Sequence, residues 1–205
     1  MRRPVSRAQA RWSAIADGNQ LARFVDRGAV VAGWIGAGMA LVLVIALALV
    51  IPIQSLVFLL ALPAGALIGA YANVRAQRHW PRRRVLGNAL WAGAVTGLAL
   101  AVLYVGVRLL FVYLDTGTMP DGSRLDCQRG PDCVYQRLVG AGYAEQLDAL
   151  GVTDAAAYEQ VVLAELSGAG ALMFAVTVAG AAIGGGAQVL TGWTSRTRQE
   201  EALAT

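Results

Sequence analysis

The chain has 205 residues, of which 57% are hydrophobic and 15% are charged, and its mean hydropathy is +0.53. This is more apolar than the ~45–50% typical of soluble domains, so the surplus must face lipid. The net charge is +4, but the arginines sit in short clusters beside hydrophobic segments, which argues against nucleic acid as a partner. We therefore expect an all-α membrane protein, a four-transmembrane-helix bundle with a folded extracytoplasmic loop between helices 3 and 4.

Residues 1–27 form a basic segment that we expect to lie in the cytoplasm, against anionic lipid headgroups. Val5, Ala8, Trp12 and Ile15 recur at helical spacing with arginines between them. A short helix in the interface plane and a frayed basic tail both fit this pattern. A secretory signal does not fit, because the apolar segment that follows is too long.

Residues 29–74 are almost continuously apolar and would make about 69 Å of helix, roughly twice a ~30 Å hydrocarbon core. The segment must therefore turn once. The turn is expected at residues 51–55, which hold a proline and the polar glutamine and serine. This predicts helices over residues 29–50 and 55–74, the second kinked at Pro63.

A cluster of arginines without any acidic residue follows the second predicted helix. It is the strongest positive-inside signal in the chain and consists of Arg75, Arg78, Arg82, Arg83 and Arg84. A third helix is expected over residues 85–114, which closes a membrane region over 28–114, and a fourth over residues 161–190. Both exceed the ~20 residues that span a bilayer. Four crossings would place both termini, including the tail at residues 191–205, in the cytoplasm.

Residues 115–160 are the long polar segment between two hydrophobic blocks, and the same four crossings place them outside the cytoplasm. They hold Cys127 and Cys133, the two cysteines of the chain. A spacing of six positions in an exported loop favours one disulfide over a metal site. The disulfide is expected to close a small hairpin across residues 130–131, which carry the turn-forming pair Gly-Pro.

The second half of this loop has helical periodicity. Apolar residues between 134 and 150 repeat at threes and fours, which predicts one short amphipathic helix ended by Gly151. Thr153 or Asp154 is then expected to cap a further helix that continues directly into the fourth span.

Two charges interrupt the apolar spans, Arg108 on the third helix and Glu165 on the fourth. Both lie a few residues from the outer ends of antiparallel helices, so they are expected at similar depth. A lone charge at mid-membrane costs about 2.5–3.5 kcal/mol on insertion scales, which favours an intramembrane ion pair between them. A proton or ion relay, or snorkelling of each charge to the interface, remains open.

Small residues recur every fourth position on the predicted spans, so that helix backbones can approach closely. Packing within one chain is the simpler interpretation, and a homo-oligomer or another membrane subunit is the alternative. The helix-packing residues are Gly65 and Gly69 on the second helix, Gly93 and Gly97 on the third, and Gly180 and Gly184 on the fourth.

Catalytic and cofactor-binding patterns are not found in the sequence. His79 is the single histidine, which argues against a zinc site and bis-histidine haem. The spacing of acids after Asp115 does not match a calcium loop. We therefore expect no cofactor, no metal site and no enzymatic activity.

Three amide side chains lie near the cytoplasmic ends of the predicted helices: Asn73, Asn88 and Gln188. They could line a polar vestibule, although capping at the interface is the simpler interpretation. Tryptophans such as Trp34 and Trp91 are expected to form an aromatic belt.

The outline of four helices, with a short first outer turn and a long second outer loop bearing Cys127 and Cys133, resembles the tetraspanins. This loop lacks their Cys-Cys-Gly sequence and has two cysteines only, so no residue or activity is carried over. The sequence favours a structural or accessory subunit, or a self-associating bundle. A small oligomeric channel or transporter is the alternative.

Overall fold

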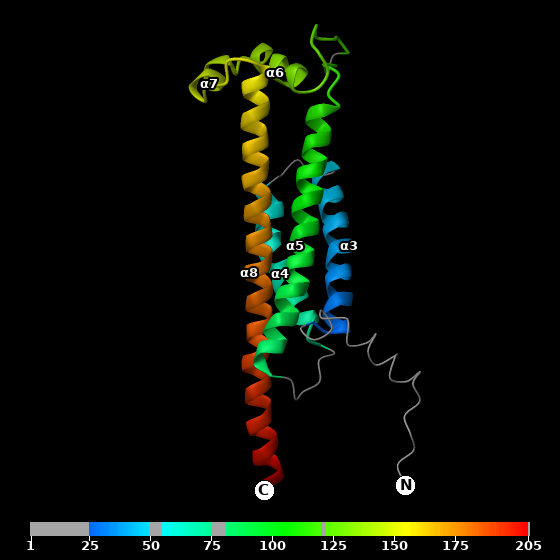
Figure 1. Ribbon diagram of the computed structural model, residues 1–205, viewed down its shortest axis with the longest axis vertical. Coiled ribbons are helices and arrows are strands. Elements are labelled where there is room, and N and C mark those ends of the chain that lie inside the picture. The colour runs from blue at the N-terminus through cyan, green and yellow to red at the C-terminus, as the bar shows by residue number, and fades with distance from the viewer. Residues whose placement is uncertain (1–24, 50–54, 75–80, 120–121, 205) are drawn as a thin grey trace, which may run out of the picture. The chain divides into compact units, whose positions relative to one another are not determined.

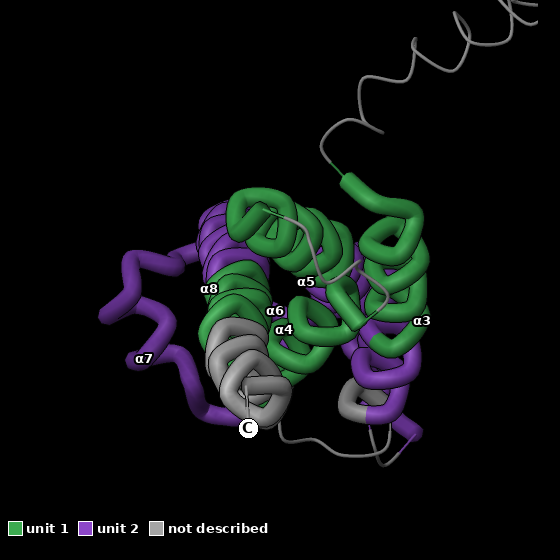
Figure 2. Tube along the Cα trace, turned by 90° about the horizontal axis from the view of Figure 1, so that it is seen from below, with its two compact units in different colours: residues 1–39, 58–97, 176–205 green, residues 40–57, 98–175 purple. Residues whose placement is uncertain are grey.

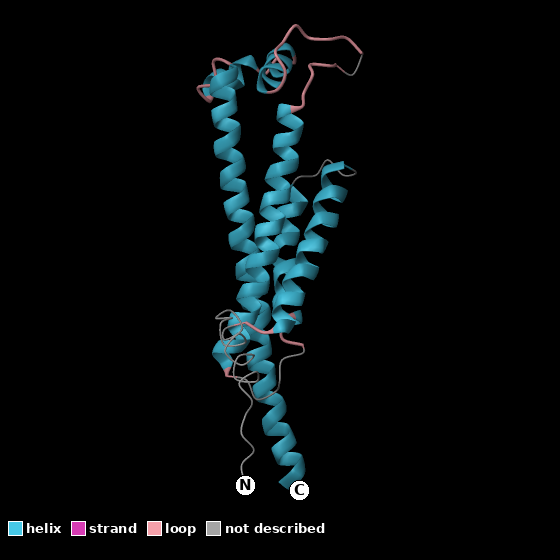
Figure 3. Ribbon diagram, turned by 45° about the vertical axis from the view of Figure 1, so that its right-hand side comes forward, coloured by secondary structure: helices cyan, strands magenta, loops and turns pink. Residues whose placement is uncertain are grey.

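The computed structural model describes residues 25–49, 55–74, 81–119 and 122–204. Within these residues the chain is helical, without a strand, which confirms the expected all-α class (Figures 1 and 3). The helices are α3 (Arg27–Leu49), α4 (Ser55–Tyr71), α5 (Arg82–Tyr113), α6 (Pro131–Gly140), α7 (Ala144–Ala149) and α8 (Ala155–Ala204).

Several expectations lie outside the described residues. They concern the interfacial helix or tail within residues 1–24, the tight turn at residues 51–54, and Arg75, Arg78 and His79.

Three of the described helices contain segments long and apolar enough to cross a bilayer: Arg27–Ala46, Arg82–Tyr113 and Ala155–Thr191. By length and composition the chain is therefore a membrane-associated protein. The apolar segment Phe58–Tyr71 is shorter. The complete helix α4 has 17 residues, about 25 Å, which is the lower limit for a span.

The predicted helix boundaries in this region are close to the observed ones. α5 begins at Arg82 where residue 85 was expected, because Pro81 accepts the hydrogen bonds of the first turn from the amides of Arg84 and Val85. A proline at this position costs nothing, since the first amides of a helix have no partner inside it. α4 continues through Pro63 as one helix.

The chain forms two compact units, which Figure 2 draws in different colours. Unit 1 comprises Met1–Met39, Phe58–Gly97 and Val176–Thr205, and unit 2 comprises Ala40–Val57 and Leu98–Ala175. Unit 1 holds the arginine-rich start of α5, and unit 2 holds α6 and α7.

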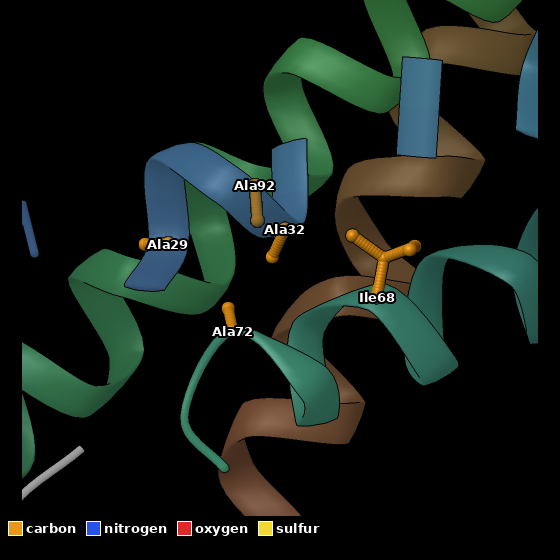
Figure 4. Packing of buried hydrophobic residues seen from close by; sticks show 5 residues of the cluster. All are labelled: Ala29, Ala32, Ile68, Ala72 and Ala92. Atoms are coloured by element: carbon orange, nitrogen blue, oxygen red, sulfur yellow. The ribbon is translucent and has the colours of Figure 1, made fainter. Parts of the chain in front are cut away.

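Unit 1 is packed around small side chains from three parts of the chain. Ala29 and Ala32 of α3, Ile68 of α4 and Ala92 of α5 form a buried cluster with Ala72, which follows α4 (Figure 4). Alanine keeps the helix backbones close together. Lipid tails are as apolar as this core, so helices in a bilayer are held by tight van der Waals contact rather than by exclusion of water.

In unit 2, residues 115–154 connect α5 to α8, and we call them the disulfide loop. The expectation of one amphipathic helix over residues 134–150 is wrong, because two helices, α6 and α7, form instead. Gly142 ends α6 in a left-handed conformation with φ +89°. The amides of Gly142 and Tyr143 donate to the carbonyls of Val139 and Leu138, which is the Schellman arrangement for ending a helix.

The same arrangement ends α7, at Gly151 as predicted from the sequence. Gly151 has φ +75°, and its amide donates to the carbonyl of Asp148 while that of Val152 donates to the carbonyl of Leu147. The side chains of Val152 and Leu147 are both buried, as the hydrophobic contact of this motif requires. Two consecutive glycine-ended turns therefore fold the loop back toward α8.

Cys127 and Cys133 lie at disulfide distance, with their Cα atoms 5.1 Å apart. The hairpin expected across residues 130–131 is wrong. Gly130 instead precedes the first turn of α6, where its carbonyl accepts a hydrogen bond from the amide of Cys133 (3.0 Å). The pair therefore ties the preceding loop to the start of a helix. Gly117 lies against it, and a β-carbon there would come within 2.5 Å of the Cys127 sulfur.

Of the two residues that the sequence offered as the cap of α8, Thr153 and Asp154, it is Asp154 that makes the capping hydrogen bond. Its Oδ1 accepts a hydrogen bond from the amide of Ala157 (2.7 Å). From Ala155 the helix continues through the apolar segment to Ala204, where an end near residue 190 was expected. The run of three glycines at residues 184–186 does not interrupt it.

Candidate functional site: a buried amide cluster

Two asparagines join three helix ends in unit 1. Asn88 of α5 is fully buried. Its Oδ1 accepts a hydrogen bond from the amide of Asp26, directly before α3 (3.0 Å), and its Nδ2 donates to Oδ1 of Asn73, beyond the end of α4 (3.4 Å). Nδ2 of Asn73 in turn donates to the carbonyls of Gly69 (3.2 Å) and Val85 (3.0 Å). These bonds hold the starts of α3 and α5 and the end of α4 together.

Gln188 adds α8 to the same cluster. Its Nε2 donates a hydrogen bond of 2.7 Å to the carbonyl of Ala70, near the end of α4. We call Asn73, Asn88 and Gln188 the asparagine clamp. The three amides that were expected at one depth thus lie at one end of unit 1, where four helices meet.

The chemistry of the clamp is that of helix capping between different helices. The last four carbonyls and the first four amides of a helix have no partner inside it. The clamp supplies partners for the carbonyls of Gly69 and Ala70 and for the amide of Asp26. Groups left unpaired in or near hydrocarbon cost several kcal/mol each. The simpler interpretation, capping, therefore describes what these amides do.

The predicted helix-packing glycines of α4 and α8 face each other's backbones. A β-carbon at Gly65 or Gly69 would overlap the carbonyl of Thr177 or Ala181. Conversely, β-carbons at Gly180 and Gly184 would overlap the carbonyls of two α4 residues, Leu62 and Ala66. The contacting residue numbers rise together, so α4 and α8 run parallel, with main chains as close as glycine permits.

α5 contacts α8 through small residues and runs antiparallel to it. In unit 1 a β-carbon at Gly93 would overlap the methyl group of Ala181, and one at Gly185 would lie 2.5 Å from that of Ala89. Gly97, the remaining predicted packing glycine, is also buried. The small residues of all four long helices were read from the sequence as packing positions, but the sequence does not show which helices they join.

Arg108 and Glu165 occupy the part of α5 and α8 that belongs to unit 2. Arg108 is half-buried and Glu165 is exposed. The phenol of Tyr158 lies within electrostatic range of both. The ion pair between Arg108 and Glu165 stays a prediction.

Polar contacts in unit 2 that the sequence did not indicate anchor the disulfide loop. Asp115, just after α5, pairs with Arg137 of α6 at 2.5 Å and also accepts the amide of Gly117 (2.8 Å). The hydroxyl of Tyr113 donates to Glu159 of α8. Asp115 and Arg137 are 22 positions apart on separate elements, so no periodicity in the sequence relates them.

The start of α5 carries the described part of the arginine cluster, Arg82, Arg83 and Arg84, without an acidic residue in the first turn. Within the described part of the chain, no group of three His, Cys, Asp or Glu side chains is placed to hold a metal ion. Comparisons of the chain with protein-family models, with curated proteins and with solved structures found no match.

Proposed function

We propose that this protein is a structural or accessory subunit of a membrane complex, or a self-associating bundle, and that it is not an enzyme. The proposal rests on the hydrogen bonds that the side-chain amides of the clamp make. Asn73, Asn88 and Gln188 each bond to backbone groups near helix ends, and Asn88 also bonds to Asn73. Side chains engaged in this way fasten helices and leave little for binding a substrate.

α4 is a fourth span in this proposal, with the clamp on the cytoplasmic side together with both termini. The clamp supports it, because the end of α4 is bonded at the level where α3 and α5 begin. α4 must therefore carry the chain back across the thickness that α3 crosses. Arg82, Arg83 and Arg84 lie at this end, where the positive-inside rule favours the cytoplasm. Residues 115–160 then lie outside.

The outward faces of the helices support association with lipid and with other helices. Large apolar side chains are exposed on every long helix, among them Val42, Leu67, Leu98 and Leu172. Between them lie glycines at which an added β-carbon would meet nothing within 4 Å: Gly38, Gly106, Gly168 and Gly186. Small residues on a lipid-facing surface allow another transmembrane helix to approach closely. A second copy or a different membrane subunit fits this surface.

The competing function is a small oligomeric channel or transporter, with the clamp or the region of Arg108 and Glu165 as its constriction. The bonding of the clamp argues against the first of these sites. An ion that was coordinated by the oxygen of Asn88 would compete with the amide of Asp26 for that oxygen and weaken the hold on the start of α3.

The mass and composition of the complex extracted gently from its native membrane test the proposal. Unrelated subunits at fixed stoichiometry, or a compact homo-oligomer that conducts no ions in liposomes, would support it. A ring of identical copies whose ion flux in liposomes is abolished by Asn88→Leu or Glu165→Gln would overturn it in favour of the channel. Fully folded variants are required for the flux assay, so each is first compared with the unaltered protein by size-exclusion chromatography.

A further inference from the structure

A groove opens in unit 1 beside the clamp, between Val25, two residues before α3, and the first turns of α5. Its volume is about 620 Å³. Arg83 and Arg84 line one end, and Leu90, Trp91 and Ala94 line the apolar remainder. Trp91 also packs against the buried alanine cluster, so the apolar wall of the groove is the outer side of the core of unit 1.

The length of α5 that lines the groove can be compared with one leaflet of a bilayer. Arg83, Gly87, Leu90 and Ala94 follow one another at threes and fours and share one face of α5. The rise from Arg83 to Ala94 is about 16 Å, close to half of a ~30 Å hydrocarbon core. Gly87 and Ala94 have little or no side chain, which leaves space beside the larger Trp91. The groove therefore has a charged end and an apolar wall from Gly87 to Ala94, which is about 10 Å long and covers part of an acyl chain.

The positive charge at this end of unit 1 favours the binding of an anion. Arg82, Arg83 and Arg84 occupy the first turn of α5, where the helix dipole is already positive and no acidic residue is present. Arg27 begins α3 nearby in the fold and is exposed, as is Arg83. Asp26 is the acidic residue next to Arg27 in the sequence. A phosphate diester would neutralise one positive charge and complement the dipole.

We propose that this groove binds one anionic phospholipid, with its phosphate at Arg83 and Arg84 and an acyl chain along Leu90, Trp91 and Ala94. Trp91 lies about 12 Å further along α5 than Arg83, so its ring would contact the acyl chain rather than the headgroup. Arginines that act only as topology signals contact many lipids without selecting one, whereas this site would bind a single lipid at a defined position. It is independent of the proposed function and applies equally to an accessory subunit and to a channel.

Titration of the lipid-depleted, full-length protein with lipids of identical acyl chains tests the site, with native mass spectrometry as the readout. We expect one phosphatidylglycerol to bind saturably, at least about tenfold more tightly than phosphatidylcholine. R83Q/R84Q is expected to weaken phosphatidylglycerol binding about 30-fold, since each arginine near a membrane surface contributes about fivefold. The control R124Q/R129Q removes the same charge from exposed arginines of the disulfide loop and should bind as the unaltered protein does.

A second variant keeps all charges and fills the groove. Ala94→Phe is expected to weaken phosphatidylglycerol binding about tenfold or more, and it decides the question if R83Q/R84Q fails to fold. Equal affinity for both lipids, an equal loss in the R124Q/R129Q control, or unaltered binding by Ala94→Phe would overturn the proposal. Displacement of the lipid by glycerol phosphate at equal concentration would also overturn it, because the site would then recognise a free anion.

Discussion

The asparagine clamp of unit 1 and the disulfide loop of unit 2 both fix helix ends, but they do so with different chemistry. The clamp uses neutral amides that bond to backbone groups and, in Asn73 and Asn88, to each other's side chain. The disulfide loop uses a cysteine pair, the ion pair between Asp115 and Arg137, and two left-handed glycines. Neutral amides can be buried at the edge of a bilayer because backbone groups accept and donate their hydrogen bonds. An ion pair is less costly in a polar segment, because its charges stay in contact with water. The comparison predicts that damage to the clamp spreads through the bundle, while damage to the loop stays local.

The largest effect is expected from Asn88→Ala. It leaves the amide of Asp26 and Oδ1 of Asn73 without their partners, at about 1–3 kcal/mol for each unsatisfied group. The thermal unfolding midpoint in detergent should fall by several degrees, with loss of protection in α3, α4 and α5. Asn88→Leu is the matched control for volume. Stability restored by leucine would show that the site requires bulk rather than hydrogen bonds, which would contradict the clamp.

The next effect is a contrast between two neighbouring glycines. Gly184→Ala places a methyl group against the carbonyl of Ala66 and should cost about 1–3 kcal/mol through displaced backbone. Gly186→Ala, two positions further along α8, meets open space and should be neutral or slightly stabilising, because alanine favours helix. Thermal unfolding of both variants gives the comparison. Equal midpoints would mean that α4 and α8 are not in backbone contact.

A smaller and local effect is expected from C127S/C133S. The bridge closes a short loop, and its removal should cost about 2 kcal/mol within the disulfide loop. Amide hydrogen exchange should rise in α6 and α7, while the exchange rates of α3 and α4 stay unaltered. Loss of protection throughout α3 and α4 would show that the loop and the bundle are one cooperative unit, which would remove the distinction drawn between them.

The sequence predicted helices in both regions. It predicted which residues lie together only for the clamp. Apolar length, prolines and arginines located α3, α5 and α8 to within a few residues, with the exception of the end of α8, because helices in lipid are set by local composition. The three amides were placed at one depth by counting along helices. Most of their partners are backbone groups, such as the amide of Asp26, and side-chain patterns in the sequence do not show these partners.

The disulfide loop was predicted less well for a related reason. The periodicity between residues 134 and 150 predicts one helix. Gly142 divides this segment into two helices, but a single glycine in a sequence does not by itself predict that a helix ends there. The ion pair between Asp115 and Arg137 joins elements whose relative placement depends on the whole loop. Pairs of residues this far apart in the sequence can be identified only from the three-dimensional fold.

The smallest effect concerns Arg108 and Glu165. If they form the expected ion pair, Glu165→Gln and Arg108→Gln should each lower the free energy of unfolding by about 0.5–1 kcal/mol, since Glu165 is exposed. A double-mutant cycle should then give a coupling energy of similar size. Independent, additive effects of the two substitutions would exclude the pair.

The arrangement of four spans with the clamp on the cytoplasmic side is tested most directly by labelling of single introduced cysteines. Arg75→Cys, Gln128→Cys and Thr205→Cys are each placed in a background in which both native cysteines are replaced by serine. Intact cells are treated with a membrane-impermeant maleimide, and permeabilised cells serve as the control. The account predicts labelling at position 128 in intact cells, and at positions 75 and 205 only after permeabilisation. Labelling of positions 75 and 205 from opposite sides of the membrane would contradict it.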